Sequence, residues 1–165
     1  MASVSYFLKL EGVEGESQID GHKGEIQLEE ARWTQENVGG GTDSEGPGAG
    51  AVKMNDFVVF MRTNKATPNL MLACPKGDSF STAVITFRKD NLDYLKWHLA
   101  PVKVSRFIHV AKESVSPSGE KTVVPLDEVH LHFQTIDCEH KGQKKDASGG
   151  GSNKKGWDKK EGKPR

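Results

Sequence analysis

Residues 1–33 constrain the fold most, because an alternating apolar segment there runs into a glycine-rich acidic turn. Within V-S-Y-F-L-K-L (residues 4–10), Val4, Tyr6, Leu8 and Leu10 fall on one face of an extended chain, since side chains alternate across a β-strand. The next segment, E-G-V-E-G-E-S, carries two glycines and three glutamates, which is typical of a turn. A second strand is predicted over residues 24–34.

The rest of the chain predicts further short strands. Residues 56–61 (D-F-V-V-F-M) form a short apolar run. Later strands are predicted over residues 79–88, 93–99, 102–112 and 123–140, with a turn at S-P-S-G, residues 116–119. Many short strands with few long linkers favour a β-barrel or a β-sandwich.

One helix interrupts this pattern. Thr67 before Pro68 resembles an N-cap followed by proline at the first helical position. Leu70, Met71 and Cys74 give an apolar helical face. Proline at position 75 and glycine at position 77 are expected to end the helix.

Charge is distributed unevenly, although the net charge of the 165 residues is zero. Residues 141–165 hold nine Lys or Arg and three Asp or Glu, which leaves residues 1–140 with a net charge of −6. The segment 141–165 is rich in Gly, Lys and Ser, and Trp157 is its only large apolar residue. We therefore expect a folded domain over residues 1–140 and a basic, disordered or loosely attached C-terminal tail.

Residues 38–51 (V-G-G-G-T-D-S-E-G-P-G-A-G-A) are predicted to form an extended loop. Six of these fourteen residues are glycine, and no large apolar side chain can offset the entropy of ordering them. Long loops in compact domains are often functional. A phosphate cradle is not favoured, because the segment lacks G-K-[ST], no helix follows it, and Asp43 and Glu45 would repel phosphate.

Several groups of residues have the chemistry of a possible site. His130 and His132 share one face of a strand, and Cys138 and His140 repeat that spacing, which would suit zinc. The simpler interpretation is a solvated polar face opposite an apolar row, which is the ordinary alternation of a barrel strand.

Other chemistries are less well supported. The acidic turn at Glu11, Glu14, Glu16 and Asp20 could bind calcium, but its spacing is not that of an EF-hand loop. No G-x-S-x-G motif is present. The basic tail has one aromatic residue, which argues against nucleic-acid binding. We expect no catalytic group, no metal and no cofactor.

The chain shows no basic segment followed by an apolar leader, and no apolar run long enough to cross a membrane. We therefore expect synthesis and folding in the cytoplasm, with no membrane insertion. The two cysteines, Cys74 and Cys138, are interpreted as reduced thiols rather than a disulfide framework.

The order and spacing of several segments resemble the hemolysin-coregulated proteins, the Hcp family of type VI secretion. The resemblance begins at Y-F-L-K-L-E-G-V-E-G-E-S (residues 6–17) and H-K-G-E-I (22–26). It continues through A-T-P-N-L-M-L-A-C-P-K-G (66–77), T-F-R-K (86–89), Y-L-K-W-H-L (94–99) and V-S-R-F (104–107). It ends with V-x-L-H-F-Q-T-I-D-C-E-H (129–140) and G-W-D (156–158), within a tail that is unusually rich in Lys and Gly.

This resemblance implies a mainly β fold, a small β-barrel of two antiparallel sheets with one flanking α-helix. It also implies six copies in a ring with a wide pore, and rings stacked into a tube. A contractile sheath would expel the tube with a spike protein at its tip. Effector proteins would ride in the pore, and the protein itself would leave the cell without a cleaved signal peptide.

On this basis the extended loop is expected to contact a neighbouring subunit or ring. Its central residues are Gly39, Gly40, Gly41, Thr42, Asp43, Ser44, Glu45, Gly46 and Pro47. Two alternatives remain open from the residues alone. One is a metal-dependent enzyme on a β-barrel that uses His130 and His132, with His140 as a further candidate. The other is a monomeric ligand-binding barrel of the lipocalin kind. The latter would need an evenly spaced eight-strand pattern, which the chain lacks.

Overall fold

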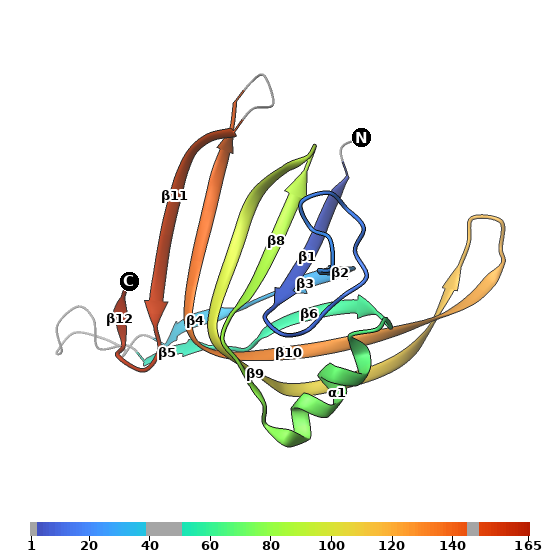
Figure 1. The fold of residues 1–165 in the computed structure, drawn as a ribbon, viewed down its shortest axis with the longest axis horizontal. Helices are drawn as coiled ribbons and strands as arrows, with labels where there is room; N and C mark the ends of the chain where they lie inside the picture. The colour runs from blue at the N-terminus through green and yellow to red at the C-terminus, as the bar shows by residue number, and fades with distance from the viewer. Residues whose placement is uncertain (1–2, 39–50, 145–148) are drawn as a thin grey trace.

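The computed structural model describes residues 3–38, 51–144 and 149–165, and strands dominate them (Figure 1). The N-terminal strands are β1 (Val4–Leu10), β2 (Ile26–Leu28), β3 (Glu30–Arg32), β4 (Gln35–Val38), β5 (Ala51–Met54) and β6 (Phe57–Arg62). The helix α1 (Thr67–Lys76) follows. The remaining strands are β7 (Ser79–Phe80), β8 (Ala83–Lys89), β9 (Leu92–Val115), β10 (Lys121–Gln143), β11 (Gly149–Asp158) and β12 (Lys163–Pro164).

Two antiparallel sheets hold these strands. The large sheet has the order β12-β11-β10-β9-β8-β1-β2, and β6 bonds to β10 on one side and to β3 on the other. Strands β4 and β5 form a separate two-stranded sheet. The predicted fold class is therefore confirmed: the chain is mainly β, with two sheets and, among the described residues, one helix.

The long strands β9 and β10 bend the large sheet into an open barrel (Figure 1). Strand β9 pairs with β10 from Leu95 to Val115, its first residues also pair with β8, and α1 packs against it. Strands β2 and β3 are separated only by Glu29, yet β2 pairs with β1 and β3 pairs with β6. This segment therefore links the β2 end of the order to the β6 branch on β10, and the barrel stays open because β2 and β3 do not pair with each other.

The core follows from the predicted alternation. Leu8 and Leu10 of β1 are buried, as are three alternate residues each of β6 and β10. These rows are Phe57, Val59 and Met61, and Val129, Leu131 and Phe133. Because each fully buried aliphatic or aromatic side chain contributes roughly 1.5–3 kcal/mol, these rows fix which face of each strand points inward.

The helix lies against β9 and differs slightly from the prediction (Figure 1). The N-cap is Ala66 rather than Thr67, and Thr67 is the first helical residue. Its hydroxyl instead accepts a hydrogen bond from the Asn64 amide at 3.0 Å. The helix passes through Pro75, and Gly77 ends it with φ +65°, a left-handed conformation that glycine adopts without strain.

The C-terminal tail differs from the expected disorder in the part that the structure describes. Strand β11 pairs with β10 from Thr135↔Asp158 to Lys141↔Ser152, and Trp157 packs against the core. The sequence did not reveal this strand because edge pairing uses backbone groups and needs few apolar side chains. The division into a domain of residues 1–140 and a tail of residues 141–165 remains a prediction, and β10 crosses that boundary.

Two further expectations concern the ends of segments. The predicted strand 24–34 is divided into β2 and β3, and the predicted strands 93–99 and 102–112 are one continuous strand, β9. The extended loop begins and ends in the β4–β5 pair, where Val38 is opposite Ala51. Its residues 39–50 lie outside the described part of the chain.

The one helix of the described residues, α1, has ten residues, too few to cross a membrane.

Candidate assembly surface

A two-stranded arm projects from the barrel (Figure 1). The arm comprises residues 109–125, which are the end of β9, the turn, and the start of β10. Its ladder runs from Ala111↔Pro125 to Val115↔Lys121 at the tip, and the pair His109↔Asp127 lies where the arm meets the barrel. Since β6 pairs with β10 only over residues 126–131, the arm has no third strand beside it in the described structure. An isolated two-stranded ribbon is at best marginally stable in water.

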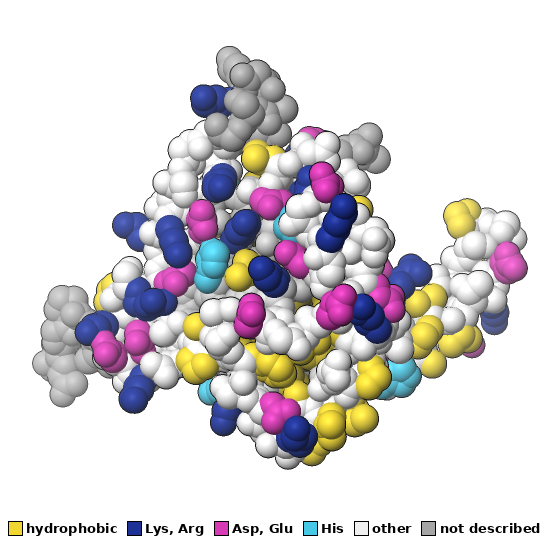
Figure 2. Space-filling model, viewed as in Figure 1, with side chains coloured by type: hydrophobic (Ala, Val, Ile, Leu, Met, Phe, Trp, Pro, Cys, Tyr) yellow, Lys and Arg dark blue, Asp and Glu magenta, His cyan; other side chains and the backbone are white. Residues whose placement is uncertain are grey.

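The arm exposes apolar side chains. Val110, Val115 and Val123 have exposed fractions of 49%, 60% and 65%. Figure 2 shows hydrophobic side chains gathered along the arm and over the region of α1, whereas charged groups cover much of the remaining face. On the helix, Met71 and Leu72 are each half exposed. Grouped exposed apolar residues of this kind mark surfaces that bind other macromolecules.

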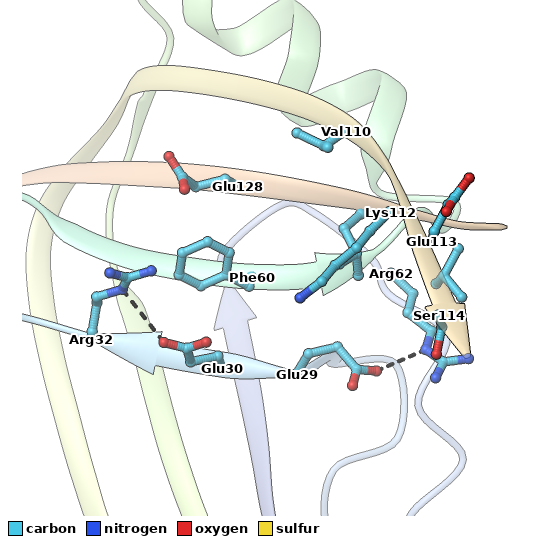
Figure 3. Close-up of a pocket in the computed structure, with 12 residues that line it drawn as sticks. Glu29, Glu30, Arg32, Phe60, Arg62, Val110, Lys112, Glu113, Ser114 and Glu128 are labelled. Carbon is cyan, nitrogen blue, oxygen red and sulfur yellow. Dashed lines mark hydrogen bonds and ion pairs between the residues drawn. The ribbon is translucent and has the colours of Figure 1, made fainter. Parts of the chain in front are cut away.

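A hollow of about 470 Å³ lies between the arm and the outer faces of β3 and β6 (Figure 3). It is lined by Glu29, Glu30, Arg32, Phe60, Arg62, Val110, Lys112, Glu113, Ser114, Val124, Leu126 and Glu128. Phe60 lies on its floor, with the Arg32 guanidinium 4.7 Å from the ring centroid. On its rim, Arg62 Nε lies 2.9 Å from Glu29 Oε1, and Arg32 Nε lies 3.5 Å from Glu30 Oε1.

These features make the hollow suitable for a macromolecular contact. Its apolar floor and charged rim are arranged like the centre and edge of a protein interface. The charges on the rim are of both signs and are partly paired with each other.

The base of the arm is held by a buried carboxylate. Asp127 of β10 is fully buried. Its Oδ2 accepts a hydrogen bond from Thr67 Oγ1 at 2.6 Å, and its Oδ1 lies 2.7 Å from His109 Nδ1. Thr63 Oγ1 donates to the same Oδ1 at 3.3 Å. Because a buried carboxylate needs such donors, Asp127 joins β9, β10 and the start of α1 at one point.

The predicted histidine pair does not converge on one site. His130 Nε2 lies 2.7 Å from Glu128 Oε2, and His132 Nδ1 lies 2.9 Å from Asp56 Oδ1. The described residues contain no group of three or more His, Cys, Asp or Glu side chains that could hold a metal ion. Each histidine therefore has a separate carboxylate partner, and the absence of a metal remains a prediction.

Asp56 also interacts with a serine, but not in a catalytic order. Ser105 Oγ donates to Asp56 Oδ2 at 2.5 Å, while His132 contacts the other oxygen of the same carboxylate. Nucleophilic catalysis would need the histidine to accept the serine proton. Burial raises the pKa of Asp56, but hydrogen bonds from Ser105 and His132 outweigh it and hold that pKa below its ordinary value.

The acidic turn is tied to the start of the helix. Glu16 Oε1 accepts a hydrogen bond from the Lys65 amide at 3.1 Å, and Glu14 Oε1 lies 3.1 Å from Lys65 Nζ. Glu14 and Glu16 therefore have protein partners, and the preference for a turn without calcium remains a prediction. The predicted contact residues 39–47 lie outside the described residues, so their role stays a proposal.

Sequence reasoning located the strands of the arm but not the arm itself. Residues 107–111 read F-I-H-V-A, which lacks a polar–apolar alternation. Apolar residues on both faces of a predicted strand are the signal that could have indicated a second contact partner. The Asp127 anchor was also missed, because its donors come from positions 60 and 64 residues away and from the facing strand.

Comparisons with known proteins agree with this geometry. The family model described as "Type VI secretion system effector, Hcp" matches residues 7–140. Protein hcp1 of Pseudomonas aeruginosa is 33% identical over 163 residues, which cover 94% of this chain and 94% of that protein.

Solved structures share the fold over the full length. The crystal structure of Hcp1 from Salmonella typhimurium superposes with a TM-score of 0.75 at 29% identity, with 100% of each chain covered. A structure described as that of a type six secretion system protein gives a TM-score of 0.87 at 21% identity, covering 99% of this chain and 100% of that one. Because the family model covers most of the chain and the P. aeruginosa relative is 33% identical over nearly its whole length, the chain belongs to the Hcp family of type VI secretion system proteins.

Proposed function

We propose that this chain is the structural subunit of a type VI secretion tube. Six copies form a ring, rings stack into a tube, and a contractile sheath expels the tube with a spike protein at its tip. Effector proteins travel in the pore, and the subunit itself is secreted without a cleaved signal peptide after assembling in the cytoplasm. The chain carries out no catalysis, and neither nucleic acid nor membrane insertion is part of this role.

The observation that carries the proposal is the arm. Val110, Val115 and Val123 remain half exposed or more, and no third strand pairs with the arm in the described residues. A ribbon of this kind gains stability only when another surface covers it. Membership of the Hcp family supplies the context, and the chain spans nearly the whole length of its P. aeruginosa relative.

A ring places different requirements on the two sides of a subunit. Ring contacts are heterologous, so one face of a subunit meets a different face of the next. The arm leaves the barrel on the side away from β11 and the β4–β5 pair (Figure 1). Because the arm lies on one side only, it can reach a different face of the next subunit, as a heterologous ring contact requires.

The extended loop is proposed as a further contact between subunits or rings. Residues 39–47 are mostly glycine and small polar residues with two carboxylates, a composition that can order against a partner without a core of its own. This part of the proposal is tested by deletion, as described in the Discussion.

Electron microscopy of the purified, untagged protein tests the proposal directly. We expect annular particles with a central opening, and stacks of such particles at high protein concentration. A field that contains only compact particles of single-chain size, at every concentration examined, would contradict the proposed function.

A further inference from the structure

The arm has two free strand edges, and they differ. On the β10 side, the edge includes Pro125, which has no N–H to donate. On the β9 side, residues 107–115 (F-I-H-V-A-K-E-S-V) contain neither proline nor glycine, and residues 109–115 are all exposed. Proteins usually protect exposed strand edges with proline, lysine or bulges. The β9 edge carries only Lys112 as such a feature.

The register identifies which backbone groups of β9 point outward. The Thr63 amide donates to the Pro125 carbonyl at 3.1 Å, so that carbonyl points toward β6 and away from β9. Pro125 is opposite Ala111, which makes this a pair without mutual hydrogen bonds. The backbone N–H and C=O of Ala111 therefore point to the free edge.

The outward orientation of the Ala111 backbone groups repeats at every second residue of β9. The pairing of β9 with β10 has no register shift between residues 106 and 115. In an antiparallel ladder, bonded and non-bonded pairs alternate. His109 and Glu113 therefore share the outward orientation of Ala111, whereas the backbone groups of Val110 and Lys112 bond to β10. Within the described residues, no hydrogen bond satisfies the outward groups of these three residues.

The base of this edge is held in position. The side chain of His109 contacts the buried Asp127, which is also bonded to Thr67 of α1. The outward groups thus begin at a fixed point and continue along a strand whose Val110 and Val115 are exposed. A preorganised edge lowers the entropic cost of adding another strand.

We infer that residues 109–113 of β9 form backbone hydrogen bonds with a strand of a second copy of this chain. The inference rests on the proposed function and deepens it, since it assigns a ring contact to one strand edge. The charge of the arm suits a second copy: Lys112 and Lys121 balance Glu113 and Glu120, and the whole chain is neutral, so like-charge repulsion is small.

A proline variant tests this inference. Ala111→Pro removes one outward N–H while leaving the bonded pairs of Val110 and Lys112 in place. Lys121→Pro is the matched control, because it places proline on the opposite edge of the same ribbon at a position of the same parity as Pro125. We expect Ala111→Pro to fold normally by circular dichroism but to weaken assembly about tenfold or more, and Lys121→Pro to assemble like the wild type. Equal assembly of Ala111→Pro and the wild type would overturn the inference.

Hydrogen exchange on the wild-type protein gives a second, mutation-free measurement. Amides of His109, Ala111 and Glu113 are expected to exchange about tenfold or more slowly in the assembled protein than in dilute subunits. Amides of Val110 and Lys112 are expected to be protected in both states. If the wild type never assembles, the proposed function fails. If it assembles while the Ala111 amide stays unprotected, only the strand-addition inference fails.

Discussion

The anchor of the arm gives the most quantitative prediction. Asp127→Ala removes a fully buried carboxylate that accepts hydrogen bonds from Thr67 and Thr63 and contacts His109. All three partners lie on other segments, so the substitution disconnects β10 from both β9 and α1 at this point. We expect a large loss of stability and a looser arm.

The magnitude follows from the contacts. A hydrogen bond to a charged group contributes about 1.5–3 kcal/mol to stability, and two of the three contacts here are short, at 2.6 and 2.7 Å. The side chain of His109 is 52% exposed, so water replaces part of its lost contact. Removing a buried charge also recovers some desolvation cost. We therefore expect a net loss of about 3 kcal/mol, which lowers Tm by about 9 °C for a domain of this size.

Thermal and urea unfolding, followed by circular dichroism, measure this loss. Asp20→Ala is the matched control, because the Asp20 side chain is 98% exposed and lies 3.7 Å from Lys23. Exposed ion pairs of this kind contribute about 0–1 kcal/mol. If Asp127→Ala and Asp20→Ala lose similar amounts of stability, the assigned role of Asp127 is wrong.

The remaining predictions concern assembly and pH. Replacing both Val115 and Val123 by Ser should leave the Tm of the isolated subunit almost unchanged. The double substitution should weaken each contact between subunits by about 2 kcal/mol, because burial of the exposed surface of each valine contributes about 1 kcal/mol. Sedimentation equilibrium measures this loss of association free energy, and association equal to that of the wild type would contradict the prediction. Deleting residues 40–48 should leave a folded subunit that assembles more weakly in the same experiment. Tubes that form as readily as those of the wild type would show that the extended loop makes no contact needed for assembly. The contacts of Asp56 hold its folded-state pKa below the ordinary value of 3.8. The ionised carboxylate therefore stabilises the fold at neutral pH, and this stabilisation is lost as pH falls below 3.8 and through the folded-state pKa. Asp56→Asn should therefore be less stable than the wild type at pH 7, and the difference should shrink as pH falls below 3.8 toward the lowered folded-state pKa; a difference in urea stability that is constant with pH would refute this.

Local pattern predicted the central elements of the fold. The alternation of Leu8 and Leu10 places β1 with the correct face inward, and the buried row of β10 follows the same rule. Gly77 ends the helix as expected, because only glycine enters the left-handed region at low cost. These features are set by residues close together in the sequence, so they can be predicted from the sequence alone.

Features that depend on distant or backbone contacts were not predictable. Strand β11 forms from G-G-G-S-N-K-K-G-W-D by pairing with the edge of β10, and composition alone suggested disorder. A threonine before proline predicts an N-cap at Thr67, but the N-cap is Ala66, and the Thr67 hydroxyl donates to the distant Asp127. The position of the arm outside the barrel depends on where β6 stops pairing with β10.

The central claim is that this chain assembles into rings of six. Size-exclusion chromatography with multi-angle light scattering on the untagged protein measures the assembled mass directly. The account predicts a species close to six times the 18.1 kDa of one chain. A single-chain mass that persists across a wide range of protein concentration would contradict it.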